Sequence, residues 1–332
     1  MLKHGGNLRM AAQRYDTPLE NWLDLSTGIN PQGWPIPELP TDIWQRLPEQ
    51  NDGLTEAMAA CYGSAHLLPT AGSQPVIQLL PTLRPASRVG VLAPSYAEHA
   101  YAWRRRGHQL VELMEDSIEA TLPELDVLIL CNPNNPTGLR FPPEKLLAWS
   151  TSLAQRDGWL VVDEAFADAV PELSIASHAG QPGLVILRSL GKFFGLAGAR
   201  VGAVLAWPAL LQRIQTELGP WTINGPARFV ATLALQDAIW QNETRQRLWT
   251  DSTRLAALLS RRGLSPTGSS PLFEWVSHPN AHALHEALAR QGIWTRYFDQ
   301  PCSIRFGLPG LPQEWQRLEA ALQQISQTLK TA

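Results

Sequence analysis

The stretch LVILRSLGKFFGLAGARVGAVLA, residues 184–206, holds two short apolar runs on either side of a glycine-rich segment. Runs of this length predict buried strands, and the segment between them carries a single lysine, Lys192. A lysine among small and apolar residues is costly to bury unless its amine is used. The stretch therefore predicts two strands of a buried sheet and a loop whose lysine has a chemical role.

Four similar apolar runs precede this stretch, and helix-compatible segments such as residues 142–158 lie between them. The runs are RVGVLAPS (88–95), HQLVELM (108–114), DVLILCNP (126–133) and WLVVDEAF (159–166). Their alternation with helices predicts an α/β fold, with a mostly parallel sheet covered on both faces. Ligands bind such sheets at the carboxyl ends of the strands. The polar residues that follow these ends are Tyr96, Asn135, Asp163, Ser189 and Lys192.

The pattern changes after residue 208, where helices are predicted over residues 208–218 and over a long stretch from Pro226 to Arg262. Three strands are then predicted, LFEWVS (272–277), GIWTRYF (292–298) and SIRFGL (303–308), with a helix near residues 280–291. The C-terminal residues have apolar side chains spaced three and four apart, which predicts an amphipathic helix. This order indicates a second, smaller α+β domain.

Composition excludes several classes of protein. The 332 residues carry a formal charge of −3, which gives no support for a nucleic-acid partner. The three cysteines are far apart in the sequence and fit neither a disulfide framework nor a metal cluster. The first residues, MLKHGGNLRM, lack the apolar run of a signal peptide, and no run is long enough to span a membrane. We therefore expect a cytoplasmic protein without a bound metal.

The surroundings of Lys192 indicate a particular cofactor. A lysine amine with a lowered pKa forms Schiff bases with aldehydes, and Ser189 and Arg200 can hold a phosphate. An aldehyde and a phosphate together point to pyridoxal phosphate. A protonated pyridine nitrogen needs a carboxylate beside it, which Asp163 offers at the end of a strand. Tyr96, after another strand, can stack on the ring.

Two further motifs fit this cofactor. TAGSQPVIQLL (70–80) places Gly72 and Ser73 before a helix, where backbone N–H groups can bind phosphate. CNPNNPTG (131–138) is a turn after a strand that is rare by chance and would place the Asn135 amide over the phenolic oxygen of the ring. Each residue alone also has an ordinary structural interpretation, such as a helix cap or a packed aromatic. The combination favours the cofactor.

The motifs AGS, APSY, NPNNPTG, DEAF and SLGKFFGLAGARVG, in this order, resemble the fold-type I pyridoxal-phosphate enzymes of the aminotransferase class I/II group. The resemblance covers roughly residues 20–310 and implies a large domain with a central sheet and a small α+β domain. It implies that Lys192 and Asp163 are the catalytic residues. It also implies a cofactor site made by Gly72, Ser73, Tyr96, Asn135, Asp163, Ser189, Lys192 and Arg200.

The N-terminal HGGN (4–7) and the later D-x-S-x-x-I-N-P-x-G segment resemble the L-threonine-O-3-phosphate decarboxylases of cobalamin biosynthesis. Phe166 adds to this resemblance, because the decarboxylases share phenylalanine at this position, where histidinol-phosphate aminotransferases usually carry tyrosine. The resemblance implies decarboxylation to (R)-1-amino-2-propanol O-2-phosphate. Two arginines suit a substrate with a carboxylate and a phosphate. The implied substrate-binding residues are His4, Gly5, Gly28, Asn135, Arg296 and Arg305.

Several alternatives stay open. HGGN has a second interpretation as a disordered tail. Arg305 has a second interpretation as a solvated strand residue. Leu47 stands where many relatives lend a phosphate-binding tyrosine across a dimer, and Gly28 where relatives often have a side-chain donor. A histidinol-phosphate-type aminotransferase is the first alternative function. A non-catalytic partner protein in aminopropanol attachment is the second.

The same resemblance gives a domain plan and an assembly. It implies an N-terminal segment, 1–34, that caps the substrate and packs with the small domain. It implies a cofactor-binding large domain, 35–225, and a small C-terminal domain, 226–332. It further implies a homodimer that acts on a phosphorylated amino acid, with a second protein of the cobalamin pathway left open as a partner.

Overall fold

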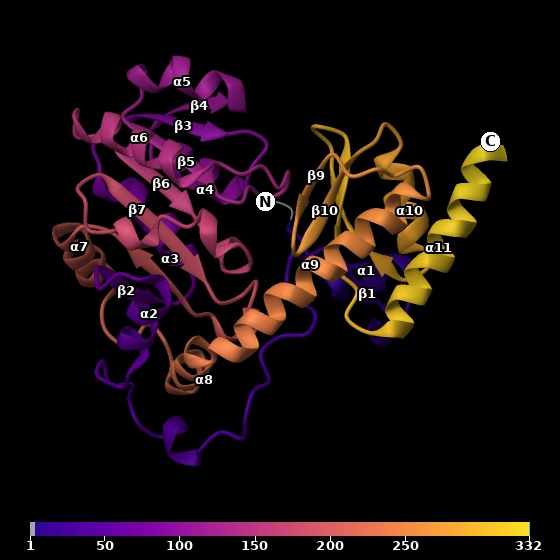
Figure 1. Cartoon of the computed structure of the whole chain (residues 1–332), viewed down its shortest axis with the longest axis horizontal. Coiled ribbons are helices and arrows are strands. Elements are labelled where there is room, and N and C mark those ends of the chain that lie inside the picture. The colour runs from indigo at the N-terminus through magenta and orange to yellow at the C-terminus, as the bar shows by residue number, and fades with distance from the viewer. Residues whose placement is uncertain (1–3, 332) are drawn as a thin grey trace. The chain divides into compact units, whose positions relative to one another are not determined.

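In the computed structural model the chain folds into two compact units, each with its own sheet (Figure 1). The structure describes residues 4–331, and side chains as far as residue 325. The large unit comprises Gly33–Asn135 and Arg140–Asn242. The small unit comprises the chain up to Gln32, Pro136–Leu139, and the chain from Glu243 onward. None of the helices in the described part of the chain combines the length and hydrophobicity of a membrane-spanning segment.

The large unit is built on a seven-stranded sheet. Its spatial order is β2 (Leu67–Thr70), β8 (Gly202–Leu205), β7 (Leu184–Ser189), β6 (Trp159–Asp163), β5 (Val127–Cys131), β3 (Arg88–Leu92) and β4 (Gln109–Leu113). The pairs from β7 to β4 are parallel, whereas β8 is antiparallel to both of its neighbours. Both strands of the stretch 184–206 are present, and the predicted α/β fold with a mostly parallel sheet is confirmed.

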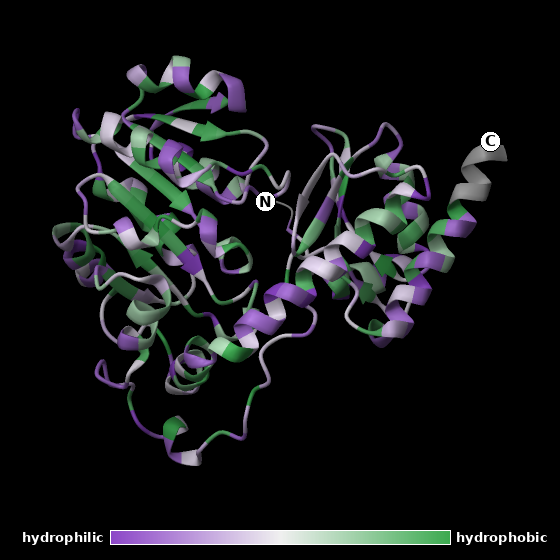
Figure 2. Ribbon diagram, in the orientation of Figure 1, coloured by the Kyte–Doolittle hydropathy of each residue, from purple (hydrophilic) through white to green (hydrophobic). Residues whose placement is uncertain are grey.

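The sheet of the large unit is apolar on both faces, as Figure 2 shows in green for its central strands. The helices of this unit are α2 (Leu54–Tyr62), α3 (Gln74–Leu79), α4 (Ala97–Arg105), α5 (Ile118–Thr121), α6 (Pro143–Ala154), α7 (Pro208–Leu218) and α8 (Gly225–Gln236). One face packs against α3, α4 and α7, with Ile77, Trp103 and Ile214 in the shared core. Every residue of β5 and β6 is buried, because alternate side chains enter opposite layers. This burial explains why the strands are continuous apolar runs.

The small unit has a four-stranded antiparallel sheet in the order β12 (Arg296–Phe298), β13 (Ser303–Gly307), β10 (Phe273–Ser277) and β9 (Gly268–Ser270). A separate parallel pair joins β1 (Leu23–Asp24) to β11 (Ile293–Trp294). Its helices are α1 (Leu8–Tyr15), most of α9 (Ala238–Ser260), α10 (Ala281–Ala289) and α11 (Pro312–Thr331). The α8 helix lies in the large unit, and the predicted functional division into 1–34, 35–225 and 226–332 stays a prediction.

Two predicted elements are each divided in the structure. The helical stretch from Pro226 to Arg262 is two helices, because Asp237 ends α8 in a non-helical conformation and its carboxylate caps Trp240 N (3.0 Å) at the start of α9. The predicted strand GIWTRYF is two strands in different sheets. β11 pairs with β1 and β12 with β13, and Thr295 between them is buried and hydrogen-bonded to His285 (2.8 Å).

Candidate functional site

The carboxyl ends of the parallel strands meet at one edge of the large sheet. Cys131 at the end of β5 is paired with Asp163 at the end of β6, and Asp163 is paired with Leu187 of β7. A pocket with about 600 Å³ of space not filled by atoms, its open mouth included, lies here. It is lined by Ser73, Gln74, Tyr96, Cys131, Asn135, Asp163, Ala165, Phe166, Ser189, Lys192 and Arg200. Seven of the eight predicted cofactor residues therefore line a single pocket.

The eighth predicted residue, Gly72, packs against the guanidinium of Arg200. It has φ +75°, and a Cβ added to it would lie 2.9 Å from Nη2 of Arg200. A larger residue would therefore be strained and would displace the arginine. Lys192 is half-buried, and its amine lies 5.6 Å from the centre of the Phe166 ring. The pocket thus combines an amine, a guanidinium, a carboxylate and an aromatic ring.

Two asparagines of the CNPNNPTG turn fasten the loops that carry Asn135 and Tyr96. The Asn132 side chain donates to the carbonyl oxygen of Phe141 (3.0 Å) and accepts from its N–H (2.9 Å). The Asn134 side chain donates to Pro94 O (2.9 Å) and accepts from the Ser95 hydroxyl (2.8 Å). Asn132 therefore closes the loop after β5 on itself, and Asn134 fixes this loop to the loop after β3. Sequence reasoning selected Asn135 but missed these two structural roles.

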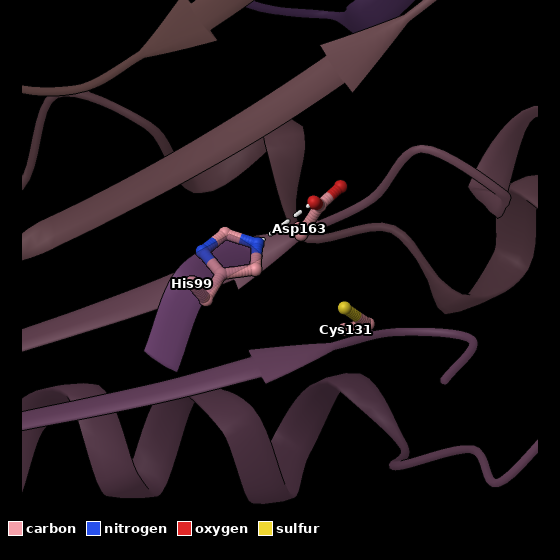
Figure 3. Close-up of side chains that lie close together, drawn as sticks. All are labelled: His99, Cys131 and Asp163. Atoms are coloured by element: carbon pink, nitrogen blue, oxygen red, sulfur yellow. Dashed lines mark hydrogen bonds and ion pairs between the residues drawn. The ribbon is translucent and has the colours of Figure 1, made fainter. Parts of the chain in front are cut away.

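Asp163 is bound by a residue that sequence reasoning missed, His99 of α4 (Figure 3). His99 Nε2 lies 2.9 Å from Oδ2 of Asp163, and Oδ1 accepts from the N–H of Ala165 (3.0 Å). Burial lowers the pKa of His99, but hydrogen bonds and charge from Asp163 and Cys131 outweigh it and raise this pKa to about 10. His99 and Asp163 therefore form a buried pair that fixes the Asp163 side chain in place. The one sequence feature that could have identified His99 is its position three residues after Tyr96.

The same three side chains also raise the question of a metal. Ligand atoms of His99, Cys131 and Asp163 all lie within 4.8 Å of one another (Figure 3). His99 Nε2 and Asp163 Oδ2 are already hydrogen-bonded to each other at 2.9 Å, so these two atoms face one another. The arrangement therefore favours an ion pair whose negative partner faces the pocket. A carboxylate in that position fits a protonated pyridine nitrogen.

A second buried ion cluster adjoins the site residues in the sequence. Arg188, next to Ser189, bonds the carboxylate of Glu164 (2.6 Å), which is next to Asp163, and also bonds Asp168. All three side chains are almost fully buried. Burial lowers the pKa of Arg188, but the two carboxylates outweigh it and raise this pKa far above its ordinary value. The cluster therefore ties the ends of β6 and β7 together.

The small unit contains the two predicted substrate arginines as direct neighbours. Arg296 of β12 and Arg305 of β13 are register partners across the antiparallel pair. Arg305 is buried and donates to the carbonyl oxygen of Ser26 (2.7 Å). Burial and repulsion by Arg296 lower the pKa of Arg305 to about 9, against the opposing charge of Asp24. Positive charge therefore exceeds negative charge here, which favours an anionic ligand.

The other predicted substrate residues belong to the same unit. His4 is exposed, and Gly28 is buried two residues beyond Ser26. Gly5 packs directly on Ser26, since an added Cβ would overlap the Ser26 carbonyl oxygen. The structure thus brings Gly5 and Arg305 onto one residue, Ser26, within the small unit. Sequence reasoning quoted the segment around Ser26 but assigned it no role.

The donors of the large-unit pocket fit pyridoxal phosphate. An amine for the aldehyde, a carboxylate for the ring nitrogen and a cation for the phosphate line the same pocket. Gly72 leaves beside the Arg200 guanidinium the space that a Cβ would fill. The mostly parallel sheet and the chemistry of the pocket at its carboxyl edge together fit the class of pyridoxal-phosphate-dependent proteins of fold type I.

Comparison with known proteins agrees with this class. A family model described as aminotransferase class I and II matches residues 22–325, so the chain belongs to that family. The match confirms the predicted fold class and the predicted dependence on pyridoxal phosphate.

The individual relatives include two threonine-phosphate decarboxylases and a histidinol-phosphate aminotransferase. The chain is 54% identical, over 97% of both chains, to threonine-phosphate decarboxylase of Pseudomonas aeruginosa. The structure of L-threonine-O-3-phosphate decarboxylase from Porphyromonas gingivalis is similar with a TM-score of 0.77 at 21% identity, over 91% of this chain and 98% of that one. Histidinol-phosphate aminotransferase from Sinorhizobium meliloti, in complex with pyridoxal-5'-phosphate, has a TM-score of 0.82 at 22% identity, over 99% and 96%.

Proposed function

We propose that this protein is a pyridoxal-phosphate-dependent decarboxylase that converts L-threonine O-3-phosphate into (R)-1-amino-2-propanol O-2-phosphate and carbon dioxide. The observation that carries the proposal is the 54% identity, over 97% of both chains, with a protein named threonine-phosphate decarboxylase. The paired arginines Arg296 and Arg305 support it, because the substrate carries two anionic groups.

The cofactor residues have distinct roles in this proposal. Bound pyridoxal phosphate supplies an electron sink for the bond that breaks at Cα. Lys192 would attach the cofactor through its amine, and Asp163, positioned by its hydrogen bond to His99, would pair with the protonated pyridine nitrogen. Tyr96 would stack on the ring, and Asn135 would bind its phenolic oxygen. Gly72, Ser73, Ser189 and Arg200 would hold the phosphate.

The substrate residues select the bond that breaks. Arg296 and Arg305 bind the phosphate and the carboxylate of the substrate, and His4, Gly5, Gly28 and Asn135 complete its contacts. These contacts would fix the orientation of the substrate carboxylate, the group that leaves as carbon dioxide. Lys192 or a water molecule would supply the proton that replaces it at Cα. The amine of the substrate stays on the product.

The family resemblance adds an assembly and a place in metabolism. The proposed protein is a cytoplasmic homodimer that supplies cobalamin biosynthesis with its aminopropanol linker. Leu47 is exposed on the large unit, where many relatives lend a tyrosine to the partner's phosphate. Whatever replaces that tyrosine contact, a dimer would cover the exposed apolar side chains Trp44 and Leu47.

The decisive experiment supplies L-threonine O-3-phosphate to the protein loaded with pyridoxal phosphate and omits any 2-oxo acid. Release of carbon dioxide and aminopropanol phosphate is the expected result. Turnover of histidinol phosphate only in the presence of 2-oxoglutarate would instead make the protein an aminotransferase. Absence of turnover with both substrates would favour the non-catalytic partner protein.

A lysine variant tests the attachment of the cofactor. Lys192→Ala should lose activity by at least about a thousandfold, because no other amine takes over the covalent attachment. Borohydride reduction followed by peptide mass spectrometry should find the cofactor on Lys192 of the wild type and nowhere in the variant. Lys145, a partly exposed lysine of α6 that pairs with Glu119, provides the matched control. Lys145→Ala should keep both activity and the labelled peptide.

A further inference from the structure

Ser26 connects three parts of the small unit through hydrogen bonds. Its side-chain oxygen accepts from the N–H of Gly6 (2.7 Å) and its hydroxyl donates to Oδ1 of Asp24 (2.6 Å). Its carbonyl oxygen accepts from Nη2 of Arg305 (2.7 Å). Ser26 is fully buried, so water is not available to replace these partners. The N-terminal segment, strand β1 and strand β13 therefore meet at this one residue.

The backbone around Ser26 is itself held on two sides. Leu25 donates to Trp294 O (2.7 Å), and Gly307 donates to the Leu25 carbonyl oxygen (2.7 Å). Asp24 also accepts from the N–H of Ser26 (2.9 Å), which closes a tight local turn. Ser26 is thus a fixed point between β11 and the end of β13. Anything bonded to its side chain is fixed relative to Arg305.

The N-terminal segment 4–6 lies close against this fixed point. Gly5 has no room for a Cβ beside the Ser26 carbonyl, and Gly6 has φ +84°, which favours glycine. The following helix α1 is anchored separately, through the ion pair of Arg14 with Glu286 (2.8 Å) and the buried Ala11. The Gly6–Ser26 hydrogen bond therefore ties the segment 4–6 to the residue that also bonds Arg305.

We propose that Ser26 is a positioning residue that holds the segment 4–6 beside Arg305, so that both can contact one bound anion. This inference rests on the proposed function, in which Arg305 and the segment bind substrate. Removing the hydroxyl leaves the Ser26 carbonyl on Arg305 but releases Gly6. Loss of the hydroxyl therefore weakens capture of the substrate and leaves the large-unit cofactor pocket and its chemistry intact.

The test combines amide hydrogen exchange with steady-state kinetics on the full-length, cofactor-loaded Ser26→Ala variant. Exchange at Gly6 should become about tenfold faster, since its N–H loses its buried acceptor. KM for L-threonine O-3-phosphate should rise about fivefold to tenfold, the effect of one lost hydrogen bond. The turnover number and the visible spectrum of the cofactor should stay unchanged.

A matched control separates this role from a general loss of a buried serine. Ser252 is equally buried in the small unit, and its hydroxyl bonds Ser270 O (3.2 Å) and Glu274 (2.7 Å), away from the N-terminal segment. Ser252→Ala should leave both Gly6 exchange and KM unchanged. If Ser26→Ala does not fold, Gly5→Ala provides a second route, because its methyl must push the segment off Ser26.

Two results would overturn the inference. The first is Gly6 exchange that is equally fast in the wild type and in a folded Ser26→Ala or Gly5→Ala variant. The second is a fall in turnover number with KM unchanged. Exchange is measured without substrate, so it decides the positioning role even if the wild type releases no carbon dioxide. A wild type that releases no carbon dioxide would refute the proposed function and would leave the positioning role of Ser26 to be decided by the exchange measurement.

Discussion

Arg188 in the large unit and Arg305 in the small unit are both buried arginines, but their surroundings differ in charge. Arg188 contacts two carboxylates, those of Glu164 and Asp168, which raise its pKa. Arg305 contacts a neutral carbonyl and faces a second arginine, Arg296; burial and then this repulsion lower its pKa to about 9, against the charge of Asp24. Burial is the same in the two cases, whereas the balance of charge is opposite.

This difference separates a structural charge from a binding charge. A buried cation whose counter-charges belong to the protein has nothing left to attract, and it serves to join the segments that carry them. A buried cation whose burial and like-charged neighbour outweigh the nearby negative charge is less favourable in the free protein and becomes more favourable when an anion arrives. Arg188 is of the first kind, and Arg305 is of the second.

Arg188→Met should produce the largest loss of stability. The change leaves Glu164 and Asp168 buried without their cation, which should lower the free energy of unfolding by about 3–5 kcal/mol. Chemical denaturation of the cofactor-free protein measures it. Arg228→Met is the matched control, because its partner Asp52 is one-third exposed, and it should cost only about 1 kcal/mol. Equal losses would contradict the importance of the buried cluster.

Arg305→Met should show the opposite pattern. It should change the stability of the free protein by less than about 1 kcal/mol, since an unfavourable charge is removed along with a hydrogen bond. KM for L-threonine O-3-phosphate should rise about a hundredfold, the loss of a charged contact worth roughly 2–3 kcal/mol. Inorganic phosphate should raise the melting temperature of the wild type but not of the variant. A variant as unstable as Arg188→Met would refute the comparison.

His99 extends the comparison to a third buried cation with its own carboxylate. Its pKa in the folded protein, about 10, lies above the ordinary 6.5. Its stabilisation is therefore complete below pH 6.5 and is lost as pH rises towards 10. Between these values the wild type should lose about 1 kcal/mol per pH unit relative to His99→Asn. Denaturation curves at several pH values test this, and parallel curves would rule out a protonated His99.

Arg296→Gln should have the smallest effect. It removes the repulsion that lowers the pKa of Arg305, so the free protein should gain up to about 1 kcal/mol of stability. It also removes one anion ligand, so KM should rise by only about fivefold to tenfold. Parallel thermal melts and initial rates measure both quantities. A loss of stability would show that the two arginines are not in conflict.

The sequence alone predicted the parts of the molecule that depend on local patterns. The apolar runs located the strands of the large sheet because both faces are buried, and residues after their ends identified the pocket around Lys192. Pairing between distant segments was not accessible. The contact of His99 with Asp163 depends on how α4 packs on the sheet, and that packing leaves no periodic signal.

The same limit explains the two predicted elements that are divided in the structure. The alternation in GIWTRYF indicates a strand, but it does not show that the first half pairs with β1 and the second with β13. Likewise, helical periodicity continues through Asp237, while the break depends on its carboxylate, which also accepts from the distant Trp34 (3.0 Å). Ser26 was overlooked because its hydrogen bonds to Gly6 and Arg305 join segments that are distant in the sequence, and no local sequence pattern indicates them.

The divided strand also constrains how this protein can evolve. One side of Thr295 fixes β1 and thereby Asp24, and the other side fixes Arg296 against Arg305. An inserted or deleted residue between 293 and 298 would shift one register against the other and would reverse the direction of every side chain beyond it. Substitutions can accumulate at the positions of this segment other than Thr295 and Arg296, but changes in its length cannot. Proteins that descend from this chain should therefore keep the length of the segment 293–298 even where its amino acids have changed.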